Sequence, residues 1–370
     1  MSHDQYIYAL CRIAAGAGYQ LTVFTTEDKF FNLKAILGEN RPDIEWILKK
    51  KEEPLKVFLG KVKRYCDKNL DVLVADSVQV GFKNSIQYLQ FNPKCKKILF
   101  VYNLNQWLDT RLSFKKSILT NYQRLIRRKI LSGFDAINLE YPPLSEYASQ
   151  FKYNKNIYTF APVFFEGSHY QDKGPIRFLV PGYIEESRRD YHFLLDVFNC
   201  LFKKYSSKAE LSLLGEPVGA YGAEIINRCA VLKDKGYPVK WFINNLTFEE
   251  FSRRIRQSDV ILNPLRQTVR HKCGIEDIYG TTKGSGVIFD ALRFGKPIIL
   301  PEYFKLAGYL KTSSLRYTHG KFLKELIESL INNRTKFDNL KNAAVIAAEE
   351  FSLDKQKARL ENMILELMAG

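Results

Sequence analysis

The stretch YGTTKGSGVIFDALRFGKPIILP, residues 279–301, contains the pattern that best indicates the fold. Residues 284–286, Gly-Ser-Gly, precede a short helical pattern, and a turn at 294–297 leads into the apolar run 298–300. Free N–H groups at a helix start favour an anion such as phosphate, and glycine lets the backbone approach it closely. Asp290 lies one helical turn after Gly286, where its carboxylate could accept hydrogen bonds from a ribose diol. The alternative is a glycine-rich turn with Asp290 on the helix surface.

Short β-branched and aromatic runs alternate with helical patterns along most of the chain. Strands are expected at 21–25, 71–75, 97–102, 135–139, 157–160, 176–181, 210–214, 239–243, 260–263 and 297–300. Helices are expected at 5–15, 192–204, 220–233, 247–257 and 286–294. Near-continuous apolar strands separated by helices indicate parallel sheets that are buried on both faces. The pattern predicts an α/β fold of two doubly wound, Rossmann-like domains that face each other across a cleft.

The expected domains are an N-terminal domain over 1–163 and a C-terminal domain over 164–350. A C-terminal helix follows over 351–370, and crossing back to the N-terminal domain is one arrangement for it. A doubly wound domain should open with a strand, yet this sequence opens on a helical pattern with Ser2 as a capping residue. Either the first strand is missing from this sequence or another element replaces it, and we expect a missing strand.

Composition indicates a globular protein, because 46% of the 370 residues are hydrophobic and 26% are charged. No apolar run is long enough to cross a membrane, and no secretory leader is visible. The six cysteines form no CxxC pair and the five histidines are dispersed, so we expect reduced thiols and no metal site. These features favour a cytoplasmic protein.

The net charge of +16 indicates an anionic partner. Part of it lies in Leu108–Leu131, where seven basic residues stand against one acidic residue at roughly helical spacing. An amphipathic helix with a basic face is predicted there. It could be a solvated helix face, a contact with an anionic membrane surface, or a contact with nucleic acid. Nucleic acid is the weakest of these, because no recognition motif accompanies the charge.

The loops after the strands of the second domain carry the candidate site residues, because ligands of open α/β sheets bind there. Paired arginines suit phosphate oxygens, although these two could instead pair with Glu185 or Glu186 on the surface. The glycines leave backbone accessible, and the long loop 266–283 has the length of a functional segment. The candidates are Gly182, Arg188, Arg189, Gly215, Asn245, Asn263, Lys283, Gly284, Ser285, Gly286 and Asp290.

This layout resembles the C-terminal half of GT-B fold glycosyltransferases, in particular the retaining group called family 4. That family has a segment E-G-F-G-L-P-x-x-E-A followed by G-K-P-(V/I)-(I/V), and Gly295–Ile299 matches the last element residue for residue. Asp290-Ala291 stands where the family has its second Glu-Ala, and Arg188 or Arg189 stands where it has its phosphate-binding Lys. The sequence differs at Thr282, where the family has its first Glu, and at Tyr183, where it has an Arg.

The resemblance implies transfer of a sugar from a nucleoside-diphosphate sugar to a glycan or lipid-linked acceptor, with retention and without a metal or other cofactor. It implies that Arg188, Arg189 and Lys283 stabilise the leaving diphosphate, with the donor bound by the glycine, serine, asparagine and aspartate candidates named above. In the N-terminal, acceptor-side domain it points to His3 and Asn103. The protein would then be cytoplasmic, or peripheral on the inner membrane face through Leu108–Leu131.

Two alternatives stay open. A non-hydrolysing sugar-nucleotide epimerase has the same layout but needs carboxylates for proton transfer at carbon. A catalytically inactive nucleotide-sugar-binding homologue would explain the departure at Thr282.

Overall fold

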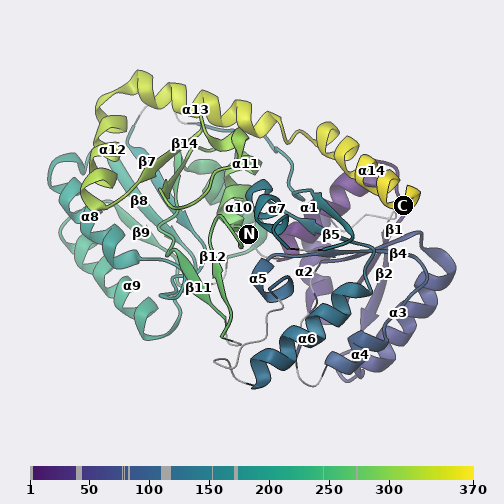
Figure 1. Ribbon diagram of the computed structural model, residues 1–370. Coiled ribbons are helices and arrows are strands. Elements are labelled where there is room, and N and C mark those ends of the chain that lie inside the picture. Colours follow the sequence, from purple (N-terminus) through teal and green to yellow (C-terminus); the bar gives the residue numbers. More distant parts are fainter. Residues whose placement is uncertain are drawn as a thin grey trace. The chain divides into compact units, whose positions relative to one another are not determined.

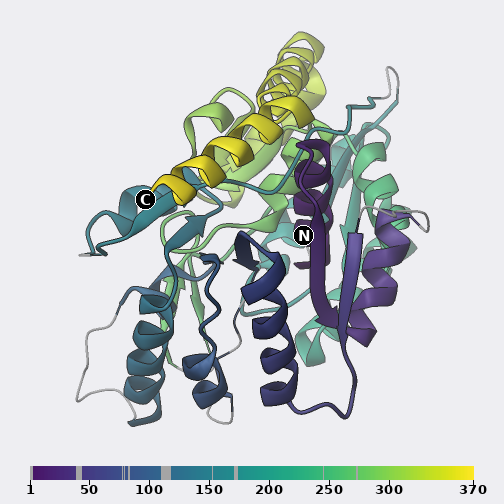
Figure 2. The same ribbon diagram turned by 90° about the vertical axis from the view of Figure 1, so that its right-hand side faces the viewer.

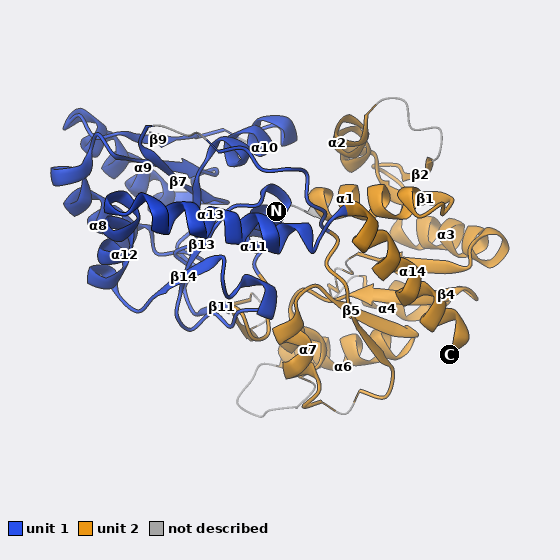
Figure 3. Cartoon of the chain, turned by 90° about the horizontal axis from the view of Figure 1, so that it is seen from above, with its two compact units in different colours: residues 1, 163–269, 285–352 blue, residues 2–162, 270–284, 353–370 orange. Residues whose placement is uncertain are grey.

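The computed structural model describes residues 3–38, 44–76, 78, 80–81, 84–109, 118–151, 153–170, 174–244, 246–271 and 274–370. Contacts within the chain divide it into two compact units, coloured in Figure 3. The C-terminal unit consists of residues 163–269 and 285–352. The N-terminal unit consists of residues 2–162, 270–284 and 353–370. The segment 270–284, which we expected in the C-terminal domain, is therefore grouped with the N-terminal unit.

The C-terminal unit is built on a six-stranded parallel sheet with the order β14-β13-β10-β7-β8-β9. Its strands are β7 (Ile176–Pro181), β8 (Ala209–Leu214), β9 (Val239–Trp241), β10 (Val260–Leu262), β13 (Ile298–Pro301) and β14 (Ser314–Tyr317). The direction of winding reverses between β7 and β10. In open α/β sheets such a reversal opens a crevice at the carboxyl ends of the two strands, where ligands bind.

Helices lie between these strands in the chain and also follow the last of them (Figure 1). They are α8 (Tyr191–Tyr205), α9 (Gly219–Asp234), α10 (Phe248–Gln257), α11 (Gly286–Phe294), η1 (Gly308–Leu310), α12 (Gly320–Asn332) and α13 (Arg334–Glu349). Helix α8 forms because Asp190 caps it, accepting a hydrogen bond from the Phe193 amide at 3.0 Å. Its apolar face, including Phe198 and Phe202, is buried in the core with strands β7 and β8.

The N-terminal unit contains two separate parallel sheets, a pair β1-β2 and a sheet with the order β3-β4-β5-β6. The strands are β1 (Leu21–Thr26), β2 (Ile44–Lys49), β3 (Val72–Ala75), β4 (Lys96–Phe100), β5 (Ala136–Leu139) and β6 (Asn156–Thr159). Figure 2 shows β1 and β2 as the purple pair of strands. The α/β class with two Rossmann-like units is confirmed, but no described strand joins the two N-terminal sheets.

The helices of the N-terminal unit are α1 (His3–Gly16), α2 (Glu27–Leu37), α3 (Leu55–Asn69), α4 (Ser85–Gln90), α5 (Leu104–Trp107), α6 (Ile118–Ser132), α7 (Pro142–Ala148) and α14 (Leu353–Ala369). Helix α14 returns to this unit, where the Gln356 amide donates to the Ala161 carbonyl oxygen at 2.6 Å. Strands β11 (Thr268–Arg270) and β12 (Glu276–Ile278) form a short two-stranded sheet. None of the helices that the structure describes combines the length and the apolar character needed to span a membrane.

The basic segment 108–131 is helical from residue 118 onward, as part of α6, while residues 110–117 lie outside the described residues. Its basic side chains do not share one solvated face. Arg124 is buried and pairs with Asp109 at 2.9 Å, and Arg127 is buried as well. The expected basic face therefore splits into a buried pair of arginines and an exposed part that contains Arg128 and Lys129.

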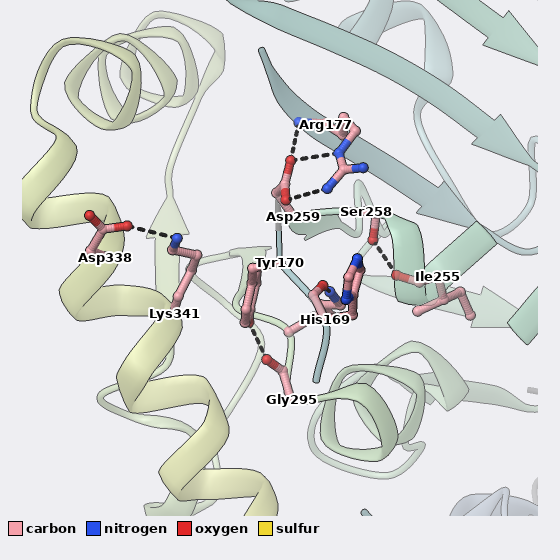
Figure 4. A network of polar contacts seen from close by, with 10 residues as sticks. His169, Tyr170, Arg177, Ile255, Ser258, Asp259, Gly295, Asp338 and Lys341 are labelled. Atoms are coloured by element: carbon pink, nitrogen blue, oxygen red, sulfur yellow. Dashed lines mark hydrogen bonds and ion pairs between the residues drawn. The ribbon is translucent and has the colours of Figure 1, made fainter. Parts of the chain in front are cut away.

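The Gly295-Lys296-Pro297 turn before β13 is held by a polar network in the C-terminal unit (Figure 4). The Tyr170 hydroxyl donates to the Gly295 carbonyl oxygen, and the Lys296 ammonium lies 4.1 Å from the centre of the Tyr170 ring. Lys296 also donates to the His169 carbonyl oxygen. Burial lowers the pKa of Lys296 to about 7, despite the opposing effect of Asp259. The motif that matches the family most closely thus contains a buried lysine.

Replacing Lys296 by methionine should change how stability depends on pH. A lysine whose pKa is about 7 in the folded protein and 10.5 in the unfolded chain lowers the free energy of unfolding most below pH 7. This penalty is relieved as pH rises from about 7 to 10.5, by about 1.4 kcal/mol per pH unit. We therefore expect the free energy of unfolding of Lys296→Met, measured relative to the native protein, to be higher at pH 6 than at pH 9. The difference between the two pH values should be about 2 to 3 kcal/mol.

Urea unfolding at the two pH values measures this difference. The matched control is Lys311→Met, because Lys311 is exposed in the same unit. Equal pH dependence of Lys296→Met and the native protein would show that Lys296 keeps its charge in the folded state.

Candidate functional site

The loops after β7 and β10 meet at the reversal point of the C-terminal sheet. Arg189 and Leu265 form an isolated antiparallel bridge, and the Asp190 amide donates to the Pro264 carbonyl oxygen at 2.9 Å. The Arg189 guanidinium is buried, donating to Asn263 Oδ1 at 3.4 Å and to the Tyr183 carbonyl oxygen at 3.2 Å. Two candidates from different loops, Arg189 and Asn263, are therefore in contact.

Bare backbone at Gly182 and Gly215 allows this approach. Gly182 has a φ of 100°, and a Cβ there would lie 2.7 Å from Nη2 of Arg189. A Cβ on Gly215 would lie 2.1 Å from the Gly182 carbonyl oxygen, closer than any packing tolerates. Gly182 requires glycine because its φ is positive, and Gly215 requires it because the backbone of Gly182 and Tyr183 occupies the side-chain space.

Two tyrosines that sequence reasoning missed hold the backbone of the loop that carries Arg189. The Tyr221 hydroxyl donates to the Arg189 carbonyl oxygen at 3.2 Å and accepts from the Tyr191 amide at 2.9 Å. The Tyr191 hydroxyl donates to the Gly182 carbonyl oxygen at 3.2 Å. Burial raises the pKa of Tyr191 to about 12, so this hydroxyl keeps its proton at neutral pH. Their spacing on two helices gave no motif that could have marked them.

The start of α11 joins the same cluster through Ser285. Asn263 Nδ2 donates to Ser285 Oγ at 3.1 Å, so the asparagine connects Arg189 to the N-cap of α11. Gly286 is partly exposed at the first turn, where helical N–H groups have no intrahelical partner. Asp290 is fully buried within α11. The alternative that placed Asp290 on the helix surface is therefore wrong. A contact between Asp290 and a ribose stays a prediction.

Arg188 does not share the hydrogen bonds that connect Arg189, Asn263 and Ser285. Arg188 is exposed, and its Nε pairs with Glu185 at 2.8 Å, as in the surface alternative considered from the sequence. A role for Arg188 at a ligand stays a prediction. Asn245 lies outside the described residues.

Lys283 and Asn103 contact each other within the N-terminal unit. They form an isolated antiparallel bridge, and the Lys283 ammonium donates to Asn103 Oδ1. A role for Lys283 at the leaving diphosphate stays a prediction. Thr282, at the position where the sequence departs from the motif of the family it resembles, is fully buried and holds the turn. Its hydroxyl accepts from the Ile278 amide at 2.7 Å, and its carbonyl oxygen accepts from the Leu104 amide at 2.8 Å. Thr282 therefore has a structural task in the segment 270–284.

Further contacts attach the segment 270–284 to the same region. The Asn105 amide donates to Asp277 Oδ1 at 3.0 Å, and Asp277 Oδ2 contacts His271 Nε2 at 2.8 Å. Asp277 is fully buried. The pairing with residues 103–105 explains why this segment belongs to the N-terminal unit.

Two carboxylates that sequence reasoning missed lie at the carboxyl ends of the N-terminal strands. Asp76 directly follows β3 and accepts a hydrogen bond from the hydroxyl of Tyr102, which follows β4. Glu140 directly follows β5 and packs so closely on Gly284 that a Cβ there would lie 2.3 Å from Oε1. Burial, together with Asp76 and Glu140, raises the pKa of Tyr102 well above its usual value. The strand-end rule that selected Asn263 would also have selected both acids.

His3 begins α1, and its side chain lies outside the described residues. Its role on the acceptor side stays a prediction.

No protein-family model and no curated protein matches the sequence. Solved structures match it across nearly its whole length. A glycosyltransferase from Rickettsia africae ESF-5 is 12% identical with a TM-score of 0.65, covering 99% of this chain and 94% of its own. Anabaena Alr3699/HepE in complex with UDP and glucose is 13% identical with a TM-score of 0.65, covering 97% of this chain and 95% of its own.

The protein TarM is more distant, at 12% identity and a TM-score of 0.56, and the match covers 85% of this chain and 58% of TarM. These similarities show the fold. They extend over both units, in agreement with the two-domain architecture expected from the sequence.

Proposed function

We propose that the protein is a glycosyltransferase whose donor is a nucleoside-diphosphate sugar bound by the C-terminal unit. The observation that carries the proposal is the cluster at the reversal point of the sheet. There Arg189, Asn263 and Ser285 connect three loops around the first turn of α11. Such a turn binds phosphate through its N–H groups and its dipole. The shared fold supports the proposal, because Alr3699/HepE has this fold and its complexes contain UDP and UDP-glucose.

The proposed chemistry is electrostatic. As the bond between the sugar and the diphosphate breaks, negative charge develops on the leaving group, and fixed donors stabilise it without reorganising. Arg188, Arg189 and the N–H groups at the start of α11 are the proposed donors. Because these groups neutralise the diphosphate in this scheme, we propose that the transfer needs neither a metal nor another cofactor. We also propose that the anomeric configuration is retained.

The acceptor is proposed to be a glycan or a lipid-linked sugar bound by the N-terminal unit. Sugar hydroxyls both donate and accept hydrogen bonds, so they suit a mixed set of amide, carboxylate and ammonium groups. Asn103 and Lys283 provide such a set, with Asp76 and Glu140 at neighbouring strand ends and His3 on α1.

Incubation with UDP-glucose or GDP-mannose, with and without a panel of sugar and lipid-linked acceptors, tests the activity. We expect free nucleoside diphosphate and a glycosylated product only when an acceptor is present, and the same rate with excess EDTA. A changed sugar nucleotide without acceptor would instead identify an epimerase. Binding of the nucleotide without turnover across the panel would identify an inactive homologue. Loss of activity in EDTA would refute the metal-free scheme.

The arginine pair should control nucleotide affinity. Titration calorimetry with UDP and GDP is expected to show weaker binding by Arg188→Ala/Arg189→Ala, by about 10- to 100-fold, because a hydrogen bond to a charged group contributes about 1.5–3 kcal/mol. Arg253→Ala is the matched control, since Arg253 is an exposed, ion-paired arginine on α10. The single variant Arg188→Ala separates the exposed arginine from buried Arg189. Unchanged affinity in the double variant would remove both residues from the donor site.

We further propose that α6 contacts an anionic membrane surface on the cytoplasmic side and so presents a lipid-linked acceptor. Helix α6 exposes apolar side chains beside basic ones. Ile118 is 90% exposed, and Leu119 and Leu125 are about half exposed. Arg128 and Lys129 are exposed on the same helix. This combination of apolar and basic side chains is typical of helices that lie on anionic lipid.

Sedimentation with vesicles tests this contact. We expect binding to phosphatidylcholine vesicles that contain about 30% phosphatidylglycerol, and weaker binding by Ile118→Ser/Leu125→Ser. Phe31→Ser is the control, because Phe31 is an apolar side chain on α2 that is 69% exposed. If both variants bind equally well, α6 is not the contact surface.

A further inference from the structure

The two parallel sheets of the N-terminal unit present strand edges that no described strand covers. In the part of the chain that the structure describes, β1 pairs with β2 alone, and β3 is the terminal strand of its sheet. Their burial reflects this position. Residues 21–24 of β1 and all four residues of β3 are only partly buried, whereas β5 is fully buried. Parallel sheets are normally covered on both faces, and an apolar strand edge is normally paired or covered, so this arrangement is incomplete.

A cavity of about 2100 Å³ is lined by both edges. Every residue of β1 and every residue of β3 contributes to its lining, together with Asp76 at the end of β3. A cavity bordered along its length by two strands has the shape that a further strand would occupy.

Helices line the same cavity with apolar side chains at helical spacing. From α1 these are Ile7, Leu10, Cys11 and Ala14, and from α3 they are Leu55, Phe58, Leu59 and Val62. Helix α3 packs against β1 through Phe24 and against β3 through Leu73, so one helix reaches both edges. An occupant would therefore meet backbone groups at its edges and apolar side chains from the helices, which is the environment of a central strand in a doubly wound sheet.

We propose that the cavity is a strand-binding site that takes up one apolar β-strand, parallel to β1 and β3, and that the polypeptide of this strand leads directly into α1. The strand would join the two N-terminal sheets into one continuous parallel sheet, with hydrogen bonds to β1 on one side and to β3 on the other.

The position of α1 determines the direction of this strand. In the first turns of α1, Asp4 pairs with Lys29, which follows the carboxyl end of β1, at 3.5 Å. The Tyr6 ring lies 5.3 Å from the ring of Tyr102, which follows the carboxyl end of β4. A strand that leads into α1 would thus end at the carboxyl ends of its neighbours. Strand, α1 and β1 then form an ordinary parallel crossover unit.

Extended variants of the chain test the proposal. In one, about six residues rich in valine and isoleucine, followed by two glycines, precede residue 1. We expect a melting temperature several degrees above that of the 370-residue chain. Hydrogen exchange should slow by at least about tenfold at the amides of β1 and β3, while those of β5, already buried, should change little.

The matched control replaces the two central apolar residues of the extension by proline, which cannot donate to a ladder. An equal rise in melting temperature with the proline version, or unchanged exchange in β1 and β3, would overturn the proposal. If the extension prevents expression, the same peptide added to the 370-residue chain at millimolar concentration gives the same readouts. A 370-residue chain that is dimeric in light scattering, with β1 and β3 already protected, would assign the site to a second copy and would also overturn it.

Discussion

The close approach of backbone at Gly182 is the constraint on which the C-terminal unit depends. Because Gly182 lacks a side chain, the Arg189 guanidinium can lie against its backbone, and because Gly215 lacks one, the loop after β8 can contact the Gly182 carbonyl. Asn263 forms hydrogen bonds with both Arg189 and Ser285, and so connects the loop that carries Arg189 to the start of α11. A larger side chain at either glycine would separate the loops that together form the candidate anion site.

The strand-end rule accounts for most of what the sequence could predict, and tertiary pairing accounts for most of what it could not. Gly182, Gly215 and Asn263 follow buried apolar runs and could be selected from the sequence alone. The place of Lys283 could not be, because it depends on a bridge to Asn103, a residue 180 positions earlier in the chain. The burial of Arg124 could not be predicted from the sequence either, because it depends on the pairing of Arg124 with Asp109.

Strand prediction failed where burial is weak or the run is short. The strand β2 has only its first residue buried and carries charged residues within it, so no apolar run marked it. The strand β14, SLRY, has an arginine in its centre and was missed for the same reason. Strands β7, β8 and β13, which lie in the core of the C-terminal unit, were predicted nearly to the residue. Periodicity reports burial, and edge strands have less of it.

The open strand edges and the candidate acceptor residues of the N-terminal unit are structurally linked, because the acceptor residues follow strands of the incomplete sheets. Asp76 follows β3 and accepts a hydrogen bond from Tyr102, which follows β4. The first turns of α1 contact Tyr102 through Tyr6, and Asp4 pairs with Lys29 beyond the end of β1. A strand that fills the cavity would end among these groups, and its turn into α1 would bring peptide N–H groups beside them. Pairing of that strand would therefore fix the polar side chains to which an acceptor hydroxyl could bind, because their positions depend on the strands that carry them.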